Sequence, residues 1–392
     1  MGTIEAQVTP EVMKWARESA KLDLPTAAQR IGRSEEEIRD WETGEKRPSL
    51  AQARRASEVY RRSLAVFYLP EPPKEFDTLR DFRQLPQGKS REWSPELALL
   101  IRRIRCRQEW LREFLVEEGF DRLSFVGSAS LSTESASLTG SIHNELGVAM
   151  KDQIACHEPR LALNLWAEHA EDAGINICQE GGVDSEEARG FVLADDYAPF
   201  IYINSNDSYG GRLFTLIHEL VHLWINQPGI SNLQDRDEQP HSPEARIERF
   251  CNSVAADVLV DKALLQLHWS QQSQGDLQER VHDAAMEFAV SEEVVARRLL
   301  ELHAISEQDY LALRQYYASR WAEYRKRQKE RRGRPRYAML MAKSNGYRFT
   351  RMVFDAYRRD RISGRDASSL LHVKVNNFSK VAQEVQVSGG DR

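Results

Sequence analysis

The stretch Thr215-Leu-Ile-His-Glu-Leu-Val-His-Leu-Trp224 decides how the whole sequence is interpreted. On an α-helix, residues four apart lie on one face, so His218 and His222 can direct their imidazoles to one point. Glu219 is displaced by one position, so it can reach a water molecule on a metal ion there rather than the ion itself. The pattern therefore predicts a hydrolytic zinc site with Glu219 as the catalytic base.

A five-residue pattern arises by chance often enough that a third ligand is required. Two glutamates, Glu244 and Glu248, lie four residues apart in the next helical stretch, 243–260, which follows a polar loop at 227–241. Either carboxylate can complete a site with the two histidines. The alternative interpretation is that His218 and His222 are core residues whose hydrogen bonds are satisfied within the fold.

The second helical stretch resembles a known family motif. It reads Glu248-Arg-Phe-Cys-Asn-Ser-Val-Ala-Ala-Asp257, and a glutamate followed by asparagine four residues later and then by Ala-Ala resembles the second-helix motif of the ImmA/IrrE family of metallo-endopeptidases. The upstream order, a strand at 200–203, then Asn204 and Arg212-Leu-Phe-Thr, is similar to the same family. The resemblance covers roughly 140–265. It implies a zincin-like fold, Zn2+ as cofactor and Glu248 as the third ligand, with Glu244 as the fallback.

The sequence departs from the family pattern at the end of the second helix, which reads Leu-Val-Asp in place of the frequent Leu-Met-Pro, and at three positions within it. Cys251 stands where the family usually has alanine, Val254 where phenylalanine is common, and Asp257 where glutamate is usual. The first two are small or apolar packing residues, so the ligands are unaffected. Catalysis also needs a hydrogen-bond donor for the developing oxyanion. The candidates for this donor, among which the sequence does not choose, are His241, His282 and Tyr202.

The N-terminal segment has the helical spacing of a small all-helical domain. Apolar periodicity predicts helices at 12–22, 25–31, 34–42 and 49–60. Ser34 and Glu37 form a capping box, and Gly44 ends the third helix. With Trp41-Glu-Thr-Gly-Glu-Lys-Arg-Pro48, this order resembles helix-turn-helix domains of the Xre/lambda-repressor type. The resemblance implies a five-helix domain over 1–69 and DNA as a partner.

The expected DNA contacts lie around the third helix of this domain. The candidate residues are Arg33, Arg39, Lys46 and Arg47. Three consecutive glutamates at 35–37 begin the same helix and would repel phosphate, and the net charge of 1–69 is only +1. DNA binding and a role in protein docking or dimerisation therefore both remain open.

Charge is distributed unevenly along the chain. Residues 70–319 carry a net charge of −19 and residues 320–392 carry +12, within a total of −6. We therefore expect any nucleic-acid contact at the ends of the chain. Arg332-Gly-Arg-Pro335 matches the core of a minor-groove AT-hook, and the alternative is a basic helix end and hinge. The helical patterns within 339–385 resemble the C-terminal extension of Xre–peptidase fusions that are thought to act as antitoxins beside a PIN-like ribonuclease toxin.

Composition limits the class of protein. The chain has 392 residues, of which 41% are hydrophobic and 29% charged, which is enough apolar material for a sizeable core. No apolar run has the length needed to span a bilayer, and the N-terminus lacks a signal-peptide pattern. We therefore expect a cytoplasmic protein without a membrane partner. The four cysteines show no Cys-x-x-Cys spacing and are expected to be reduced.

The fold class expected from these patterns is α+β, mainly α. Short β-branched runs at 174–178, 190–193 and 200–203 predict a small sheet, while the Ser/Gly/Thr-rich stretch 127–140 is typical of a linker or loop. Long helices are predicted at 95–118, 211–226 and 243–260. The expected domains are a helix-turn-helix domain (1–69), a helical connector (70–139), a metallopeptidase domain (140–319) and a basic helical extension (320–392).

Two functions follow from these observations and resemblances. The first is a zinc-dependent, site-specific endopeptidase that acts on a regulatory protein, such as a transcriptional repressor, in a stress, prophage or toxin–antitoxin circuit. The second is an antitoxin and transcriptional autoregulator that binds DNA and a toxin, with a structural or regulatory metal domain. Replacement of Glu219 separates them, because only the first needs a catalytic base.

Overall fold

The computed structural model describes residues 5–60, 62, 64–73, 80–81, 93–231, 242–272, 275–330 and 336–387. Two compact units are distinguished by their internal contacts. The first comprises Met1–Thr78 and Leu85–Arg105, and the second Leu79–Gln84 and Cys106–Arg392. The long helix α5, Pro95–Glu117, contributes its beginning to the first unit and its remainder to the second.

The first unit contains the helices expected for the N-terminal segment. They are α1 (Pro10–Ser19), α2 (Leu24–Ile31), α3 (Glu35–Thr43) and α4 (Leu50–Val59), followed by the short 3-10 helix η1 (Leu64–Tyr68). The predicted capping box of Ser34 and Glu37 begins α3, and Gly44 ends it with a φ of 83°. A buried ion pair between Arg17 Nε and Glu42 Oε1, 2.7 Å apart, joins α1 to α3.

The second unit is built around a small mixed sheet. Its strands are β1 (Arg80–Asp81), β2 (Asn176–Glu180), β3 (Gly190–Leu193), β4 (Phe200–Asn204) and β5 (Gly229–Ser231). Their order is β1-β5-β3-β4-β2, with β2 parallel to β4 and β3 antiparallel to both β4 and β5. The three predicted strands are present, β2 beginning at Asn176 rather than Gly174. The short strands β1 and β5 were not expected.

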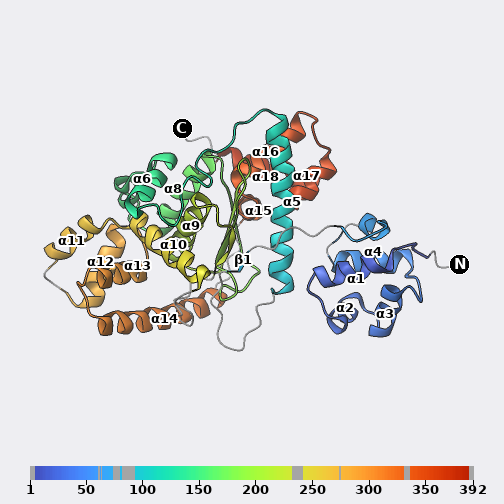
Figure 1. Ribbon diagram of the computed structural model, residues 1–392, viewed down its shortest axis with the longest axis horizontal. Coiled ribbons are helices and arrows are strands. Elements are labelled where there is room, and N and C mark those ends of the chain that lie inside the picture. Colours follow the sequence, from blue (N-terminus) through green and yellow to red (C-terminus); the bar gives the residue numbers. More distant parts are fainter. Residues whose placement is uncertain are drawn as a thin grey trace. The chain divides into compact units, whose positions relative to one another are not determined.

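Helices cover this sheet (Figure 1). Those that follow α5 are α6 (Ser135–Leu146), α7 (Met150–Ile154), α8 (Pro159–Asp172), α9 (Tyr209–Trp224), α10 (Pro243–Leu259), α11 (Lys262–Gln271), α12 (Leu277–Glu287), α13 (Glu292–Glu301) and α14 (Glu307–Glu330). The described part of the chain is thus mainly helical with a small mixed sheet, which confirms the expected balance. Among the described residues, no helix is both long and apolar enough to cross a membrane.

The prediction of a loop over the whole of 127–140 was wrong. Helix α6 begins at Ser135 and buries Leu138, Ile142 and Leu146 in the core of the second unit. These residues have helical spacing, and the burial of their side chains stabilises the helix despite the low helix propensity of its serines and glycine. Composition alone therefore missed the first turns of this helix.

The C-terminal helices pack on the body that contains the sheet. They are α15 (Tyr337–Asn345), α16 (Tyr347–Arg358), α17 (Gly364–Leu371) and α18 (Phe378–Val387), with the 3-10 turn η2 (Val375–Asn377) before the last. The Cys178 thiol on β2 donates a hydrogen bond to the Asn345 carbonyl oxygen at 3.5 Å. Gly346 has a φ of 84°, and a β-carbon there would lie 3.0 Å from the carbonyl oxygen of Ile177. These helices therefore cover the outer edge of β2 (Figure 1), an edge that would otherwise be open to pairing.

Glu171 on α8 connects this C-terminal part to the core. The residue is 6% exposed. Its carboxylate accepts hydrogen bonds from the backbone N–H groups of Tyr347 at 2.9 Å and Arg348 at 3.2 Å. These are the first two residues of α16, where free N–H groups and the helix dipole favour an anion. Burial nevertheless raises the pKa of Glu171 to about 7, although nearby Arg351 and the backbone donors oppose the rise.

We expect Glu171→Gln to change how stability depends on pH. Because folding raises the pKa of this carboxyl from 4.5 to about 7, the folded chain binds its proton more tightly than the unfolded chain. Its contribution is complete below pH 4.5 and is lost as the pH rises through 7, by about 3 kcal/mol. Urea unfolding of both proteins near pH ~5 and ~8 should show the wild type losing stability relative to the variant. A difference between them that does not change with pH would contradict this assignment.

Candidate metal centre

Helix α9 carries the predicted motif through the interior of the second unit. It begins after β4, where the Ser208 hydroxyl accepts a hydrogen bond from Gly211 N at 3.0 Å. It then packs against α8, α10 and strands β3 and β4, and every residue from Leu213 to Trp224 except Phe214 is buried. A helix that is apolar nearly all round belongs in a core, so the histidines and the glutamate along it are buried as well.

The two histidines and Glu248 converge. His222 Nε2 lies 3.0 Å from His218 Nε2 and 3.1 Å from Glu248 Oε1, and His218 Nε2 lies 3.4 Å from Glu248 Oε2. The exposed fractions of the three residues are 0%, 1% and 4% for His218, His222 and Glu248. Their donor atoms all lie within 4.8 Å of one another, so these side chains can hold a metal ion. Two imidazole nitrogens and one carboxylate are a donor set that suits zinc with a coordination position left open.

The backbone beyond α9 orients one of these ligands. His222 Nδ1 lies 2.9 Å from the carbonyl oxygen of Gln227, which can only accept a hydrogen bond. When His222 loses a proton to bind a metal ion, the remaining proton is therefore on Nδ1, and the lone pair of Nε2 is left for the ion. Gln227 follows Asn226, whose φ of 48° turns the chain back towards the helix. No sequence signal could identify Gln227, because it acts through its main chain.

Charge within the cluster also suits a cation. Burial by itself raises the pKa of Glu248, but the adjacent imidazoles of His218 and His222 lower it to about 2. Burial likewise opposes a charge on His222, but the neighbouring Cys251 thiol and Glu248 carboxylate raise its pKa well above the ordinary value. Glu248 is therefore ionised, and a cation is favoured beside it. A metal ion must displace the proton from His222, so its affinity should fall in acid.

The catalytic base predicted from the sequence lies beside the ligands and outside their cluster. Glu219 is fully buried on α9, and only His218, His222 and Glu248 form the group of converging donors. Its carboxylate lies towards strand β3, because Oε1 would be 3.1 Å from a β-carbon placed on Gly190. Glu219 therefore contacts a different neighbour from the ligands, and its expected contact with a metal-bound water stays a prediction.

The other candidates for this centre lie elsewhere or have other partners. Glu244 is exposed in the first turn of α10 and is outside the cluster. Tyr202 donates its hydroxyl hydrogen to the Glu180 carbonyl oxygen at 3.0 Å, and His282 Nδ1 lies 2.7 Å from Glu292 Oε1 with the His282 side chain 53% exposed. His241 lies outside the described residues. The identity of an oxyanion donor stays a prediction.

Cys251 is part of the surroundings of the centre. It lies one turn after Glu248 on α10, is fully buried and contacts His222, and burial raises the pKa of its thiol. From the sequence, Cys251 was expected to be a small packing residue at a position where the family usually has alanine. A cavity of about 450 Å³ in the second unit is lined in part by Gln227, Arg246 and Leu131.

In the first unit, the candidate DNA contacts differ in their partners. Lys46 Nζ lies 2.6 Å from Asp40 Oδ2, and Arg33 Nη1 lies 3.8 Å from Glu37 Oε1. Arg39 and Arg47 are exposed and have no ion pair with any residue that the structure describes. The AT-hook candidate at 332–335 lies outside the described residues.

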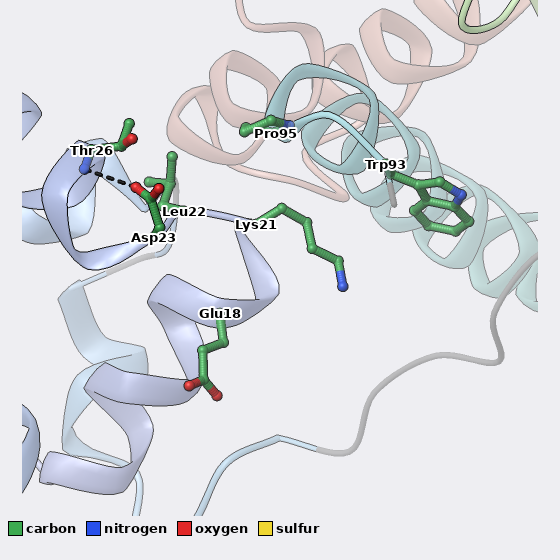
Figure 2. A pocket seen from close by; sticks show the side chains of 7 residues that line it. All are labelled: Glu18, Lys21, Leu22, Asp23, Thr26, Trp93 and Pro95. Atoms are coloured by element: carbon green, nitrogen blue, oxygen red, sulfur yellow. Dashed lines mark hydrogen bonds between the residues drawn. The ribbon is translucent and has the colours of Figure 1, made fainter. Parts of the chain in front are cut away.

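This unit also contains a shallow cavity of about 370 Å³ between the end of α1, the start of α2 and the start of α5. Figure 2 shows the side chains that line it, among them Glu18, Lys21 and Trp93. Asp23 lines it too, but its carboxylate is engaged in capping α2 through Thr26 N at 2.9 Å. The cavity contains no converging donor set and has no evident chemistry.

Comparison with known families bears on the second unit only. The model of the peptidase M78 family, described as an IrrE N-terminal-like domain, matches residues 170–300. No curated protein and no solved structure matched the chain. The matched residues include both histidines and both glutamates of the centre. We conclude that residues 170–300 are similar to the IrrE N-terminal-like domain of M78 peptidases, whose members are generally zinc-dependent.

Proposed function

We propose that this protein is a zinc-dependent, site-specific endopeptidase. The observation that carries the proposal is the convergence of His218, His222 and Glu248 with Glu219 beside them, inside a segment similar to M78 peptidases. The substrate we propose is a regulatory protein, such as a transcriptional repressor, in a stress, prophage or toxin–antitoxin circuit. The class of this substrate rests on the sequence resemblance to Xre–peptidase fusions.

The residues of the centre have separate tasks in this proposal. Zinc, when bound, polarises the scissile carbonyl and lowers the pKa of water to about 7. His218, His222 and Glu248 hold the ion, and Gln227 keeps His222 in the tautomer that can bind it. Glu219 takes the proton from the attacking water and passes it to the leaving amine. The buried surroundings exclude other water and strengthen these electrostatic interactions.

We expect about one zinc ion per chain in the purified protein. His222→Ala and Glu248→Ala should each lose most of it, because each removes one of three donors that meet in the cluster. Glu244→Ala is the matched control, since Glu244 lies on the same helix but is exposed and outside the cluster. Elemental analysis with circular dichroism measures both metal and fold. A folded wild type that stays zinc-free after zinc is supplied would remove the proposal.

Glu219→Gln should keep its zinc and lose proteolysis. The substitution preserves the size of the side chain and removes the basic carboxylate, so cleavage should fall by about 10²- to 10⁴-fold. New protein N-termini can be compared in cells that produce the wild type or the variant at equal levels. Cleavage products that appear equally with both proteins would exclude Glu219 as the base.

A second candidate function is that of an antitoxin and transcriptional autoregulator, which binds DNA and a toxin, with a PIN-like ribonuclease as the proposed toxin. The exposed Arg39 and Arg47, which lack an ion pair among the described residues, favour a phosphate contact by the first unit. In this case the metal domain is structural or regulatory, and Glu219→Gln has little effect.

DNA binding can be tested through its dependence on salt. The double variant Arg39→Ala/Arg47→Ala should reduce the slope of log affinity against log salt by about 2 on a mixed-sequence duplex, because each arginine accounts for one phosphate. Arg33→Ala/Lys46→Ala is the control with equal charge loss, and it should change the slope less because Glu37 and Asp40 already neutralise these side chains. Equal effects of the two pairs would show that the ion pairs do not decide the contact.

A further inference from the structure

The first residue of strand β3 lies unusually close to helix α9. A β-carbon placed on Gly190 would lie 2.4 Å from Thr215 Cγ2, 3.0 Å from the Tyr202 carbonyl oxygen and 3.1 Å from Glu219 Oε1. Gly190 is not among the glycines with a positive φ, so its backbone suits any residue. Space, and not conformation, is therefore what excludes a side chain at this position.

The neighbours of Gly190 cannot easily give way. Thr215 is 1% exposed, its χ1 is restricted by β-branching, and its hydroxyl donates to the Gly211 carbonyl oxygen at 2.9 Å. Gly190 itself is paired on both sides, with Ile203 of β4 and with Ser231 of β5. A side chain here would therefore have to move the strand away from α9 or displace the Glu219 carboxylate.

Helix α9 presents two adjacent stripes to two different neighbours. His218 and His222, four residues apart, converge with Glu248 of α10. Thr215 and Glu219, also four apart, both lie against Gly190 of β3. The ligands and the base are thus held by separate contacts, although they alternate along one helix.

We propose that Gly190 is a positioning residue for Glu219: its missing side chain lets β3 lie against the Thr215–Glu219 stripe and so holds the Glu219 carboxylate beside the metal ligands. The proposal rests on the function proposed above. It follows that a methyl group at residue 190 disturbs the base and leaves the ligands intact. A misplacement of a catalytic group by about 1 Å can lower turnover about 100-fold. A shift of the Glu219 carboxylate by that amount would therefore have a measurable effect on the rate.

The test compares Gly190→Ala with three other variants. Glu219→Gln reports complete loss of the base. Gly140→Ala is the matched control, because a β-carbon at Gly140 on α6 meets nothing within 4 Å. The double variant Gly190→Ala/Thr215→Ser removes Cγ2, the atom at 2.4 Å, and keeps the hydroxyl that bonds to Gly211.

The first readout needs no substrate. Each protein is loaded with Co2+, and its visible absorption is followed from mildly acidic to mildly alkaline pH. The midpoint is the pH at which the absorption is halfway through its change, and a carboxylate near the bound ion would affect it. We expect all four variants to bind one metal ion per chain. The midpoint of Gly190→Ala should move towards that of Glu219→Gln, Gly140→Ala should match the wild type, and the double variant should return most of the way to it.

The second readout is turnover of a substrate that the wild type cleaves. We expect Gly190→Ala to lower kcat about 100-fold with little change in metal affinity, and the double variant to recover most of the loss. Recovery through removal of one methyl group elsewhere would not follow from a general loss of stability. It would identify the contact between residues 190 and 215 as the cause.

The outcomes separate this proposal from the proposed function. If Glu219→Gln shifts the midpoint and Gly190→Ala does not, the positioning role is overturned and the peptidase proposal stands. If the protein binds no metal, or Glu219→Gln leaves the midpoint unchanged, both are overturned. If Gly190→Ala does not fold, a double variant that folds with a wild-type midpoint supports the proposal, and one that also fails to fold overturns it, because the 2.4 Å overlap is then not the cause.

Discussion

Burial of polar side chains along one helix is the constraint on which the rest of this structure depends. Helix α9 lies in the apolar core and carries two imidazoles and a carboxylate there. A buried polar group that lacks a partner costs about 1–3 kcal/mol, so the core must supply partners. His222 contacts Gln227 and Glu248, and His218 contacts Glu248 through Nε2, while His218 Nδ1 has no hydrogen-bond partner among the described residues. The contacts that make this burial tolerable are also those that assemble the donor set.

Different neighbours of α9 contact its metal ligands and its Glu219. On one side α10 brings Glu248 to the histidines, and on the other the sheet brings the bare backbone of Gly190 to Glu219. The single-residue displacement between His218 and Glu219 is a feature of the sequence, but the meaning of that displacement depends on what packs against each stripe. The sheet therefore contributes to the chemistry of the centre, in addition to its part in the core.

The C-terminal helices belong to the same body as the centre. Their contacts with β2 and α8 pass through Asn345, Gly346 and the N-terminus of α16, and they protect the outer edge of a strand that is parallel to β4. The helix terminus favours the ionised form of the Glu171 carboxyl, and burial disfavours it. The C-terminal helices thus lie in the same compact unit as the metal ligands.

The sequence by itself determined what depends on local spacing. It predicted the helices that became α9 and α10, strand β3, the cap at Ser34 and the stripe of His218 and His222, because periodicity and capping act within a few residues. Glu248 needed a family resemblance to be preferred over Glu244. The tertiary structure alone decided that Gln227 orients His222, that Gly190 lies against Glu219, and that Asp40 neutralises Lys46. It also decided that α6 begins inside a serine-rich stretch. Each of these depends on main-chain atoms, on space or on burial between neighbours in the fold, and residue type and spacing do not encode such contacts.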